Sequence, residues 1–129
     1  MQINNIDSSF TVKKYTTISP ENYDIIIEGM ERVIKDNNGT AHNIKSDDII
    51  ICGKTGTAQN PHGEDHSIFI AFAPKEDPEI AIAVYVENGG WGSKWAAPIA
   101  SLIIEKYTNS EINTDLEEFI LNGKISYIK

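Results

Sequence analysis

Apolar residues recur at helical spacing in the segment that follows Ser19 and Pro20. Serine is a good helix N-cap, and proline is tolerated in the first turn, where its missing N–H costs nothing. We therefore expect a helix over residues 20–36, ended by the turn-forming run 36–39 (Asp-Asn-Asn-Gly). Its apolar stripe consists of Tyr23, Ile26, Ile27, Met30, Val33 and Ile34.

Three apolar runs further along the chain, 49–59, 67–73 and 80–87, have the composition of β-strands. The second and third runs are separated only by the short polar turn 74–78. Short connections join antiparallel neighbours, because a parallel pair needs a long crossover. The pattern therefore predicts a three-stranded antiparallel meander.

The third run places its large and small side chains on opposite faces. Its β-branched residues alternate with Ala81 and Ala83. Small side chains leave room for a close neighbour, so we expect a helix to pack on the alanine face. Both faces of the middle strands are apolar, and two helices are few to cover them, which indicates that the chain is part of something larger.

A second helix is expected over residues 95–107, with Pro98 close to its start because proline is tolerated only in the first turn. In the tail, 109–129, the residues from 114 to 121 have the pattern of a further short helix. Helices around an antiparallel meander make an α+β fold.

The N-terminal segment, the two tryptophans and the single cysteine each allow a further structural expectation. The lead-in around Phe10–Tyr15 is either a short strand or an extended segment. Trp91 and Trp95 flank the start of the second helix, and we expect them to pack in the core or in a lid. The lone Cys52 lies in an apolar run, where we expect a small buried core residue.

Composition and charge narrow the function classes. The formal net charge is -8, from 19 acidic and 11 basic residues, which argues against a nucleic-acid surface. His62 and His66 are four apart, but Pro61 and Gly63 disfavour a helix there, so we expect neither a metal site nor a cofactor.

No apolar stretch approaches the roughly 20 residues that span a bilayer. The first residues lack the basic region and apolar core of a signal peptide. Any membrane anchor is therefore expected outside this sequence.

The first strand carries the residues with chemical potential. Lys54 offers a positive charge on an otherwise apolar strand, and Thr55 and Thr57 offer hydroxyls. Gly56 lacks a side chain that would block the approach of an extended substrate. A backbone N–H of this strand could also face a developing oxyanion.

Lys54-Thr55-Gly56-Thr57 resembles the third motif of the penicillin-binding proteins and serine β-lactamases. The surroundings resemble the C-terminal segment of the class B enzymes, most closely the penicillin-binding protein 2 type, over roughly residues 15–108. The matching segments are 29–30 (Gly-Met), 39–41 (Gly-Thr-Ala), 66–74, 80–86, 87–90 (Glu-Asn-Gly-Gly) and 96–100 (Ala-Ala-Pro-Ile-Ala).

The resemblance implies a partial penicillin-binding/serine β-lactamase-like fold and a peptidoglycan D,D-transpeptidase. It implies that the Lys-Thr-Gly strand binds substrate as an added strand. Lys54 would then contact the serine of the second motif and favour the substrate carboxylate, which Thr55 and Thr57 would also contact. The Thr57 N–H would supply half of the oxyanion hole. Stem peptides and β-lactams would be ligands of the parent, which would be anchored in the cytoplasmic membrane with this domain outside it.

The sequence departs from the family in the motifs that precede Lys-Thr-Gly. The only Ser-x-x-Lys is Ser126–Lys129, behind the third motif, where we interpret it as coincidence, and Ser-x-Asn does not occur. We therefore expect this chain alone to be inactive, since the family acylates that serine. A D,D-carboxypeptidase or β-lactamase fragment, and a non-catalytic binding domain that uses the same strand edge, remain alternatives.

The strand at 80–87 is interior in the family, where an N-terminal strand pairs with its far side. That partner is absent here unless the segment around Phe10–Tyr15 replaces it. An uncharged, β-branched edge without proline is prone to pair with another strand. The sequence therefore predicts self-association through this edge.

Overall fold

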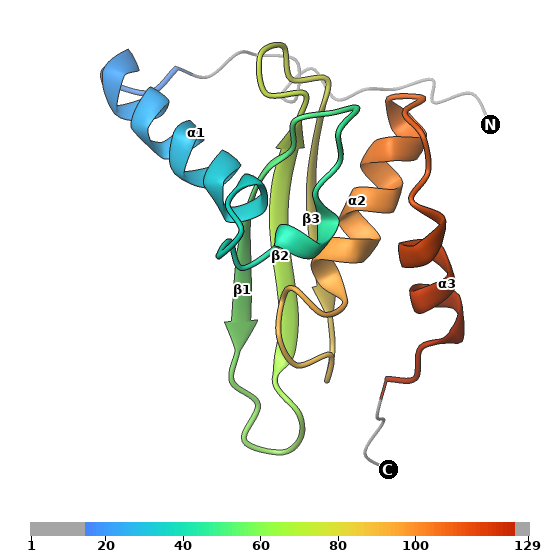
Figure 1. The fold of residues 1–129 in the computed structure, drawn as a ribbon. Helices are drawn as coiled ribbons and strands as arrows, with labels where there is room; N and C mark the ends of the chain where they lie inside the picture. Colours follow the sequence, from blue (N-terminus) through green and yellow to red (C-terminus); the bar gives the residue numbers. More distant parts are fainter. Residues whose placement is uncertain (1–14, 126–129) are drawn as a thin grey trace, which may run out of the picture.

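The computed structural model describes residues 15–125 and has an α+β architecture (Figure 1). Its elements in order are α1 (Pro20–Lys35), the short 3-10 helix η2 (His42–Ile44), β1 (Cys52–Ala58), β2 (His66–Ala73), β3 (Ile80–Val86), α2 (Ala96–Tyr107) and α3 (Thr114–Asn122). β1 is shorter than the expected strand 49–59, because residues 49–51 approach the sheet without strand pairing.

The three strands form one antiparallel sheet in the order β1-β2-β3, which confirms the predicted meander. The register places Lys54 opposite Ile70, and Thr57 opposite Ser67. On the other side of β2, Ile70 lies opposite Ala83. Within residues 15–125, β1 and β3 are therefore both edge strands.

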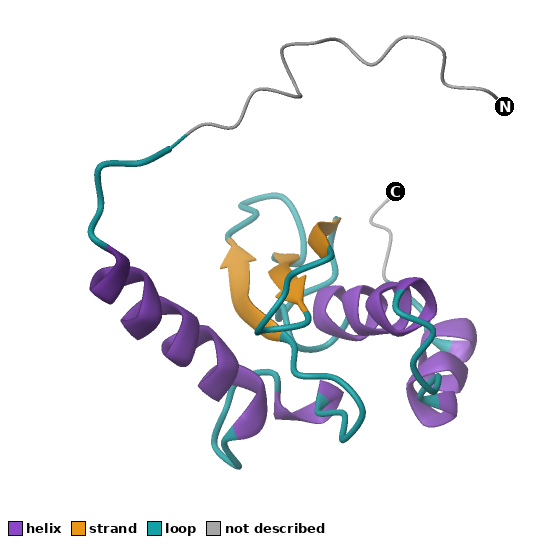
Figure 2. Ribbon diagram, turned by 90° about the horizontal axis from the view of Figure 1, so that it is seen from above, coloured by secondary structure: helices purple, strands orange, loops and turns teal. Residues whose placement is uncertain are grey.

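The hydrophobic core lies on one face of the sheet. Phe69 and Ala71 of β2 are buried there, together with Ile34 of α1 and Ile44 of η2. From α2 the core receives Ala96, Ala97, Ala100 and Ile104. Seen from above, α1 lies beside β1, while α2 and α3 lie on the other side of the molecule (Figure 2).

The expected helix on the alanine face of β3 is not there. α2 packs instead on the face of the β-branched residues of β3, which join the core cluster. Ala81 and Ala83 are exposed, and so are Ile70 and Tyr85 on the same face. The reason is the apolar area that is buried: Ile and Val remove more surface from water than Ala, so the single available layer of helices covers them.

Short alanines on α2 allow that helix to approach the sheet closely. Its outer side carries α3, which docks where the ring of Trp95 stacks on Phe119 with 5.1 Å between centroids. Trp95 is only 5% exposed, as expected of a packing residue. Trp91 is 76% exposed, so of the two expected roles, packing in the core or in a lid, the first is wrong for this residue.

The single cysteine and the two ends of the described chain bear on three further expectations. Cys52 is fully buried, as predicted. Tyr15 is exposed and belongs to no strand, while Phe10 and Val12 lie outside the described residues. Ser126–Lys129 also lies outside them. None of the helices within residues 15–125 is long and apolar enough to cross a bilayer.

Candidate functional site

The four residues Lys54 to Thr57 lie in the middle and second half of β1, at the edge of the sheet. Lys54 and Thr57 are exposed, and Thr55 and Gly56 are half-buried. α1 lies beside the first part of β1, and the strand runs on beyond the helix toward its end (Figure 1). All four expected site residues are therefore available at the surface of one strand.

Lys54 lies in a groove between β1 and the C-terminal half of α1. Its Nζ donates to the carbonyl of Thr55 at 2.7 Å, which curls the side chain back along the strand. The groove has a volume of about 360 Å³. Its other lining residues are Gly29, Arg32, Val33, Asp36, Asn38, Gly39 and Thr40. A ligand that offers Lys54 a carboxylate competes here only with one neutral carbonyl.

Thr55 is joined to the segment that follows α1. The hydroxyls of Thr40 and Thr55 are 2.9 Å apart. Thr40 is positioned by its neighbour Ala41, whose N–H donates to the carbonyl of Val33 at 2.9 Å and whose side chain is buried. Sequence reasoning assigned no role to Thr40, although it belongs to the Gly-Thr-Ala segment on which the resemblance partly rests.

Gly56 and Thr57 face opposite sides of the sheet. A Cβ on Gly56 would lie 3.3 Å from Cβ of Ile68 and would meet only Ile68 within 4 Å, on the exposed face. Thr57 lies opposite Ser67, a fully buried serine of β2. The Gly56–Thr57 backbone is thus bordered by β2 on one side and has no second partner strand among residues 15–125.

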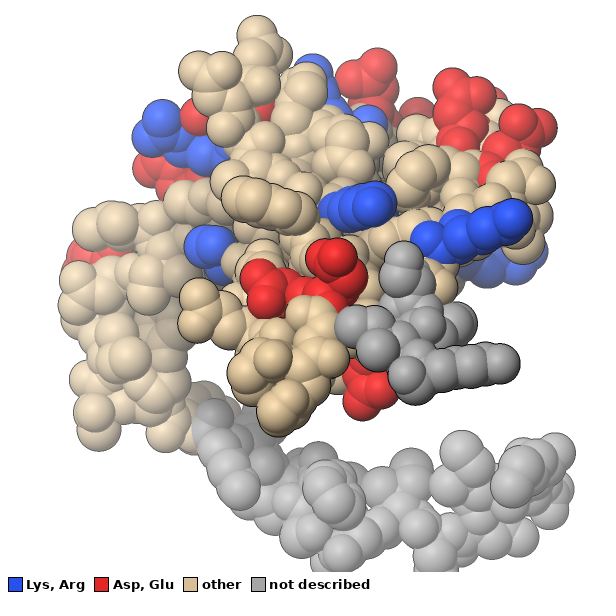
Figure 3. Space-filling model, turned by 90° about the horizontal axis from the view of Figure 1, so that it is seen from below, with Lys and Arg blue, Asp and Glu red and all other residues tan. Residues whose placement is uncertain are grey.

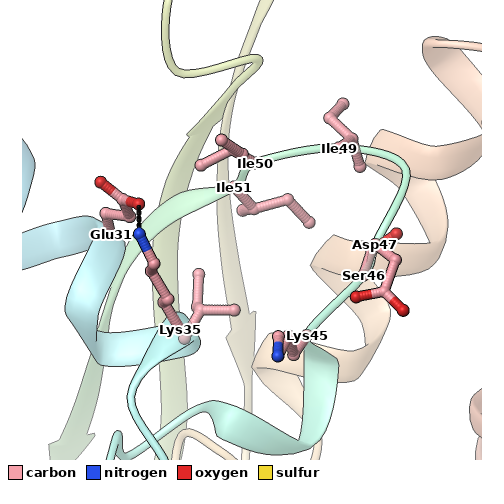
Figure 4. Close-up of a pocket in the computed structure, with 9 residues that line it drawn as sticks. Glu31, Lys35, Lys45, Ser46, Asp47, Ile49, Ile50 and Ile51 are labelled. Carbon is pink, nitrogen blue, oxygen red and sulfur yellow. Dashed lines mark hydrogen bonds and ion pairs between the residues drawn. The ribbon is translucent and has the colours of Figure 1, made fainter.

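A separate cavity lies on the far side of α1, and Figure 4 shows its lining. It has a volume of about 170 Å³ and is bordered by Glu31, Lys35 and residues 45–47 and 49–51. The carboxylate of Glu31 is almost buried and binds Lys35 at 2.8 Å and Lys75 at 2.7 Å. These two cations, Lys35 first, lower the pKa of Glu31. Because both carboxylate oxygens are paired, this cluster ties α1 to the turn after β2.

His62 and His66 lie at the end of the sheet where β1 connects to β2. His66 Nδ1 accepts the backbone N–H of Asn88 at 3.1 Å, and the side chain of Asn88 is bound by Asn60 at 2.9 Å. His62 is exposed. Across residues 15–125, no group of three or more His, Cys, Asp or Glu side chains is arranged to hold a metal ion.

Charged side chains are interspersed on the face seen from below (Figure 3). Acidic groups lie singly or in small clusters, with lysines and arginines between them. No large field of one sign therefore covers this face.

The fold and the place of this strand within it define the class of the protein, which is that of the penicillin-binding transpeptidases. The chain belongs to the penicillin-binding protein transpeptidase domain family, whose family model matches residues 2–105.

Curated relatives support the same family. The chain is 34% identical over 100 residues to the peptidoglycan D,D-transpeptidase MrdA of Haemophilus influenzae, which covers 65% of this chain and 15% of that protein. It is 42% identical over 74 residues to the peptidoglycan D,D-transpeptidase PbpA of Mycobacterium tuberculosis, covering 49% of this chain and 15% of the relative. The chain thus spans about a seventh of the length of these relatives.

Solved structures show the same fold. PBP2 of Pseudomonas aeruginosa, solved with WCK 5153, matches with a TM-score of 0.65 and 35% identity, over 75% of this chain and 22% of that chain. Penicillin-binding protein A of M. tuberculosis, solved as a ceftriaxone acyl-enzyme complex, matches with a TM-score of 0.60 and 35% identity, over 68% and 21%. These comparisons identify the chain as similar to the penicillin-binding protein 2 type.

Proposed function

We propose that β1 is the substrate-binding strand of a peptidoglycan D,D-transpeptidase, and that this chain is the C-terminal segment of its transpeptidase domain. The observation that carries the proposal is the Lys-Thr-Gly-Thr sequence on an edge strand with one partner among residues 15–125. An edge of this kind can receive an extended peptide through main-chain hydrogen bonds. A stem peptide of peptidoglycan is the substrate that the family implies.

The roles of the four residues follow from their chemistry. Lys54 provides the positive charge for a substrate carboxylate and for the serine of the second motif. Thr55 and Thr57 provide hydroxyl donors to the same carboxylate. Gly56 has no side chain that would project from the exposed face of β1 toward the substrate. The N–H of Thr57 contributes to the oxyanion hole, where a preorganised donor stabilises the negative charge that develops.

The nucleophile is proposed to come from elsewhere in the whole protein. The printed sequence has Ser-x-x-Lys only at Ser126–Lys129 and has no Ser-x-Asn. Acyl transfer in the family needs a serine next to a base in the same site as the Lys-Thr-Gly strand. The chain by itself should therefore bind the substrate strand weakly and form no acyl-enzyme.

Further properties of the whole protein are part of the same proposal. β-Lactams are expected as covalent ligands of its serine, because the similar penicillin-binding protein A of M. tuberculosis was solved as an acyl-enzyme complex with ceftriaxone. We also propose that the whole protein is anchored in the cytoplasmic membrane and exposes this domain on the outer side, where peptidoglycan is cross-linked.

The first test uses the chain alone. Intact-mass spectrometry after incubation with penicillin should show no added mass. A stoichiometric adduct that peptide mapping assigns to Ser126 would overturn the proposed source of the nucleophile.

The second test uses the whole protein. Lys54→Ala should slow acylation by about a hundredfold, the usual loss for one donor of this type, or about 3 kcal/mol. Lys106→Ala, at an exposed position of α2, is the matched control and should leave the rate unchanged. Equal rates for both variants would favour the alternative of a non-catalytic binding domain.

A further inference from the structure

The segment that connects β3 to α2 is held at both sides. On β2, the hydroxyl of Ser67 donates to the carbonyl of Trp91 at 2.9 Å and accepts the N–H of Ala96 at 3.1 Å. On η2, the side-chain amide of Asn43 donates to the carbonyl of Ser93 at 3.0 Å. The segment 91–96 is thus fixed between the middle strand and the helix that follows Thr40.

Between these two points, the segment lies directly on β1. Gly92 is buried, and a Cβ at this position would lie 2.6 Å from the carbonyl oxygen of Gly56 and 3.0 Å from its nitrogen. It would also overlap the carbonyl oxygen of Ile68. Backbone therefore packs on backbone here, and only glycine allows the approach. Gly92 therefore packs against the Gly56 backbone and limits its position from one side.

Ser67 is positioned to hold the segment that carries Gly92. It is fully buried and lies directly opposite Thr57 in the β1–β2 register. It also supplies what α2 lacks, because the N-cap residue Trp95 makes no side-chain cap hydrogen bond. A polar side chain at a buried strand position is costly unless its hydrogen bonds are made. Those bonds here all go to the segment that presses on Gly56.

We propose that Ser67 is a positioning residue for the Gly56–Thr57 backbone, acting through the segment 91–96 and its Gly92. The inference rests on the proposed function, in which the N–H of Thr57 takes part in catalysis. Loss of the Ser67 hydroxyl leaves the Ala96 N–H without its acceptor and frees the Trp91 carbonyl from β2, although that carbonyl still accepts the N–H of Lys94 at 2.9 Å within the segment. The segment then shifts to find other partners, Gly92 leaves Gly56, and the Thr57 N–H loses its fixed direction.

The test compares two fully buried serines. Ser67→Ala removes the hydroxyl next to β1, and the control Ser101→Ala removes one that donates to Glu105 on α2 at 2.8 Å. Hydrogen–deuterium exchange of the full chain is measured for the β1 segment 52–58 and for the β3 segment 80–86. This readout separates local loosening of β1 from a general loss of stability.

We expect Ser67→Ala to raise the exchange of segment 52–58 by about tenfold relative to segment 80–86. Ser101→Ala should change both segments in proportion. Equal changes of the two segments in Ser67→Ala would overturn the proposal. If that variant does not fold, Ser67→Cys is tested by the same comparison, because its slightly larger thiol still fills the site but is only a weak hydrogen-bond donor and acceptor.

A second arm uses the whole protein and its acylation by penicillin. Ser67→Ala should lower the maximal acylation rate about tenfold with little change in the affinity of the first complex, since only the oxyanion donor is displaced. The exchange measurement does not depend on activity. Its result therefore tests the positioning role of Ser67 independently of the role proposed for Lys54. Changed exchange with an unchanged acylation rate would overturn the catalytic part of the inference.

Discussion

The side-chain hydroxyls of Thr40 and Thr55 lie 2.9 Å apart and join the segment after α1 to the proposed substrate strand. These residues are fifteen apart in sequence and belong to different elements. Rotation of the Thr55 hydroxyl toward a ligand would break its hydrogen bond with Thr40. The bond therefore fixes the orientation in which the Thr55 hydroxyl faces a ligand.

Thr40→Val should therefore weaken ligand binding more than folding. Thr40 is exposed, so the free energy of unfolding should fall by no more than about 1 kcal/mol. In the whole protein, we expect acylation to slow by about three- to tenfold, the equivalent of one neutral hydrogen bond. Stopped-flow acylation and thermal unfolding measure the two effects, with Thr114→Val on α3 as the exposed control. Larger loss of stability than of acylation would contradict this role.

Gly53 and Gly29 should respond oppositely to alanine. A Cβ on Gly53 would overlap the ring of Phe69, which is fully buried. Gly53→Ala should therefore cost about 1–3 kcal/mol of stability by overpacking. A Cβ on Gly29, inside α1, would extend into open space, so Gly29→Ala should stabilise by about 0.5–1 kcal/mol.

Chemical denaturation of both variants checks the pair. Adding Phe69→Leu to Gly53→Ala should recover part of the loss, because the smaller side chain vacates the space. Additive losses in the double variant would show that Phe69 is not the group that excludes the methyl.

The ion cluster at Glu31 predicts sensitivity to acid. Its folded pKa is lowered from the ordinary value of 4.5 by hydrogen bonds from Lys35 and then Lys75. The cluster therefore stabilises the fold above that ordinary value, and this contribution is lost as the pH falls through the lower, folded pKa.

Glu31→Gln should cost about 1–3 kcal/mol at pH 7 and should flatten the decline of the melting temperature below pH 5. The control is Glu76→Gln, since Glu76 is 85% exposed and lies 3.9 Å from Lys75. A surface pair of this kind contributes little. If the two variants gave the same pH profile, the stabilising role of the buried carboxylate would be refuted.

The outer edge of β3, which has no partner strand among residues 15–125, should support self-association of the chain. An antiparallel pair of β3 strands centred on Ala83 places Glu79 opposite Glu87 of the second copy, twice. These like charges oppose pairing at low ionic strength, so association should increase with salt between about 0.05 and 0.5 M. Light scattering after size exclusion, at tens of micromolar (roughly the range where such edges pair), gives the mass.

Two lysine substitutions distinguish edge pairing from stacking of the exposed sheet face. Ala83→Lys is tolerated by the fold because Ala83 is exposed, and it should abolish pairing through the edge. Ile70→Lys, on the exposed face of the central strand, should leave edge pairing intact. A monomer at every salt concentration, or loss of association only in Ile70→Lys, would contradict the edge model.

Local signals in the sequence were enough to predict the helices and strands of this protein. Helical spacing after Ser19, strand composition and the short turn at 74–78 are local signals, and they led to α1, the antiparallel meander and α2. The Lys-Thr-Gly motif could also be found from sequence, because its residues are contiguous and the strand places them together without help from the rest of the fold.

How these elements pack against one another could not be predicted from local sequence signals. Alternation along β3 showed two faces but not which of them α2 would cover, since that depends on the total apolar area within reach of one helix layer. Thr40, Ser67 and Gly92 were missed for the same reason. Their partners Thr55, Trp91 and Gly56 are 15 to 36 residues away in the chain, and no local pattern encodes a contact that forms only when strand, loop and helix pack together.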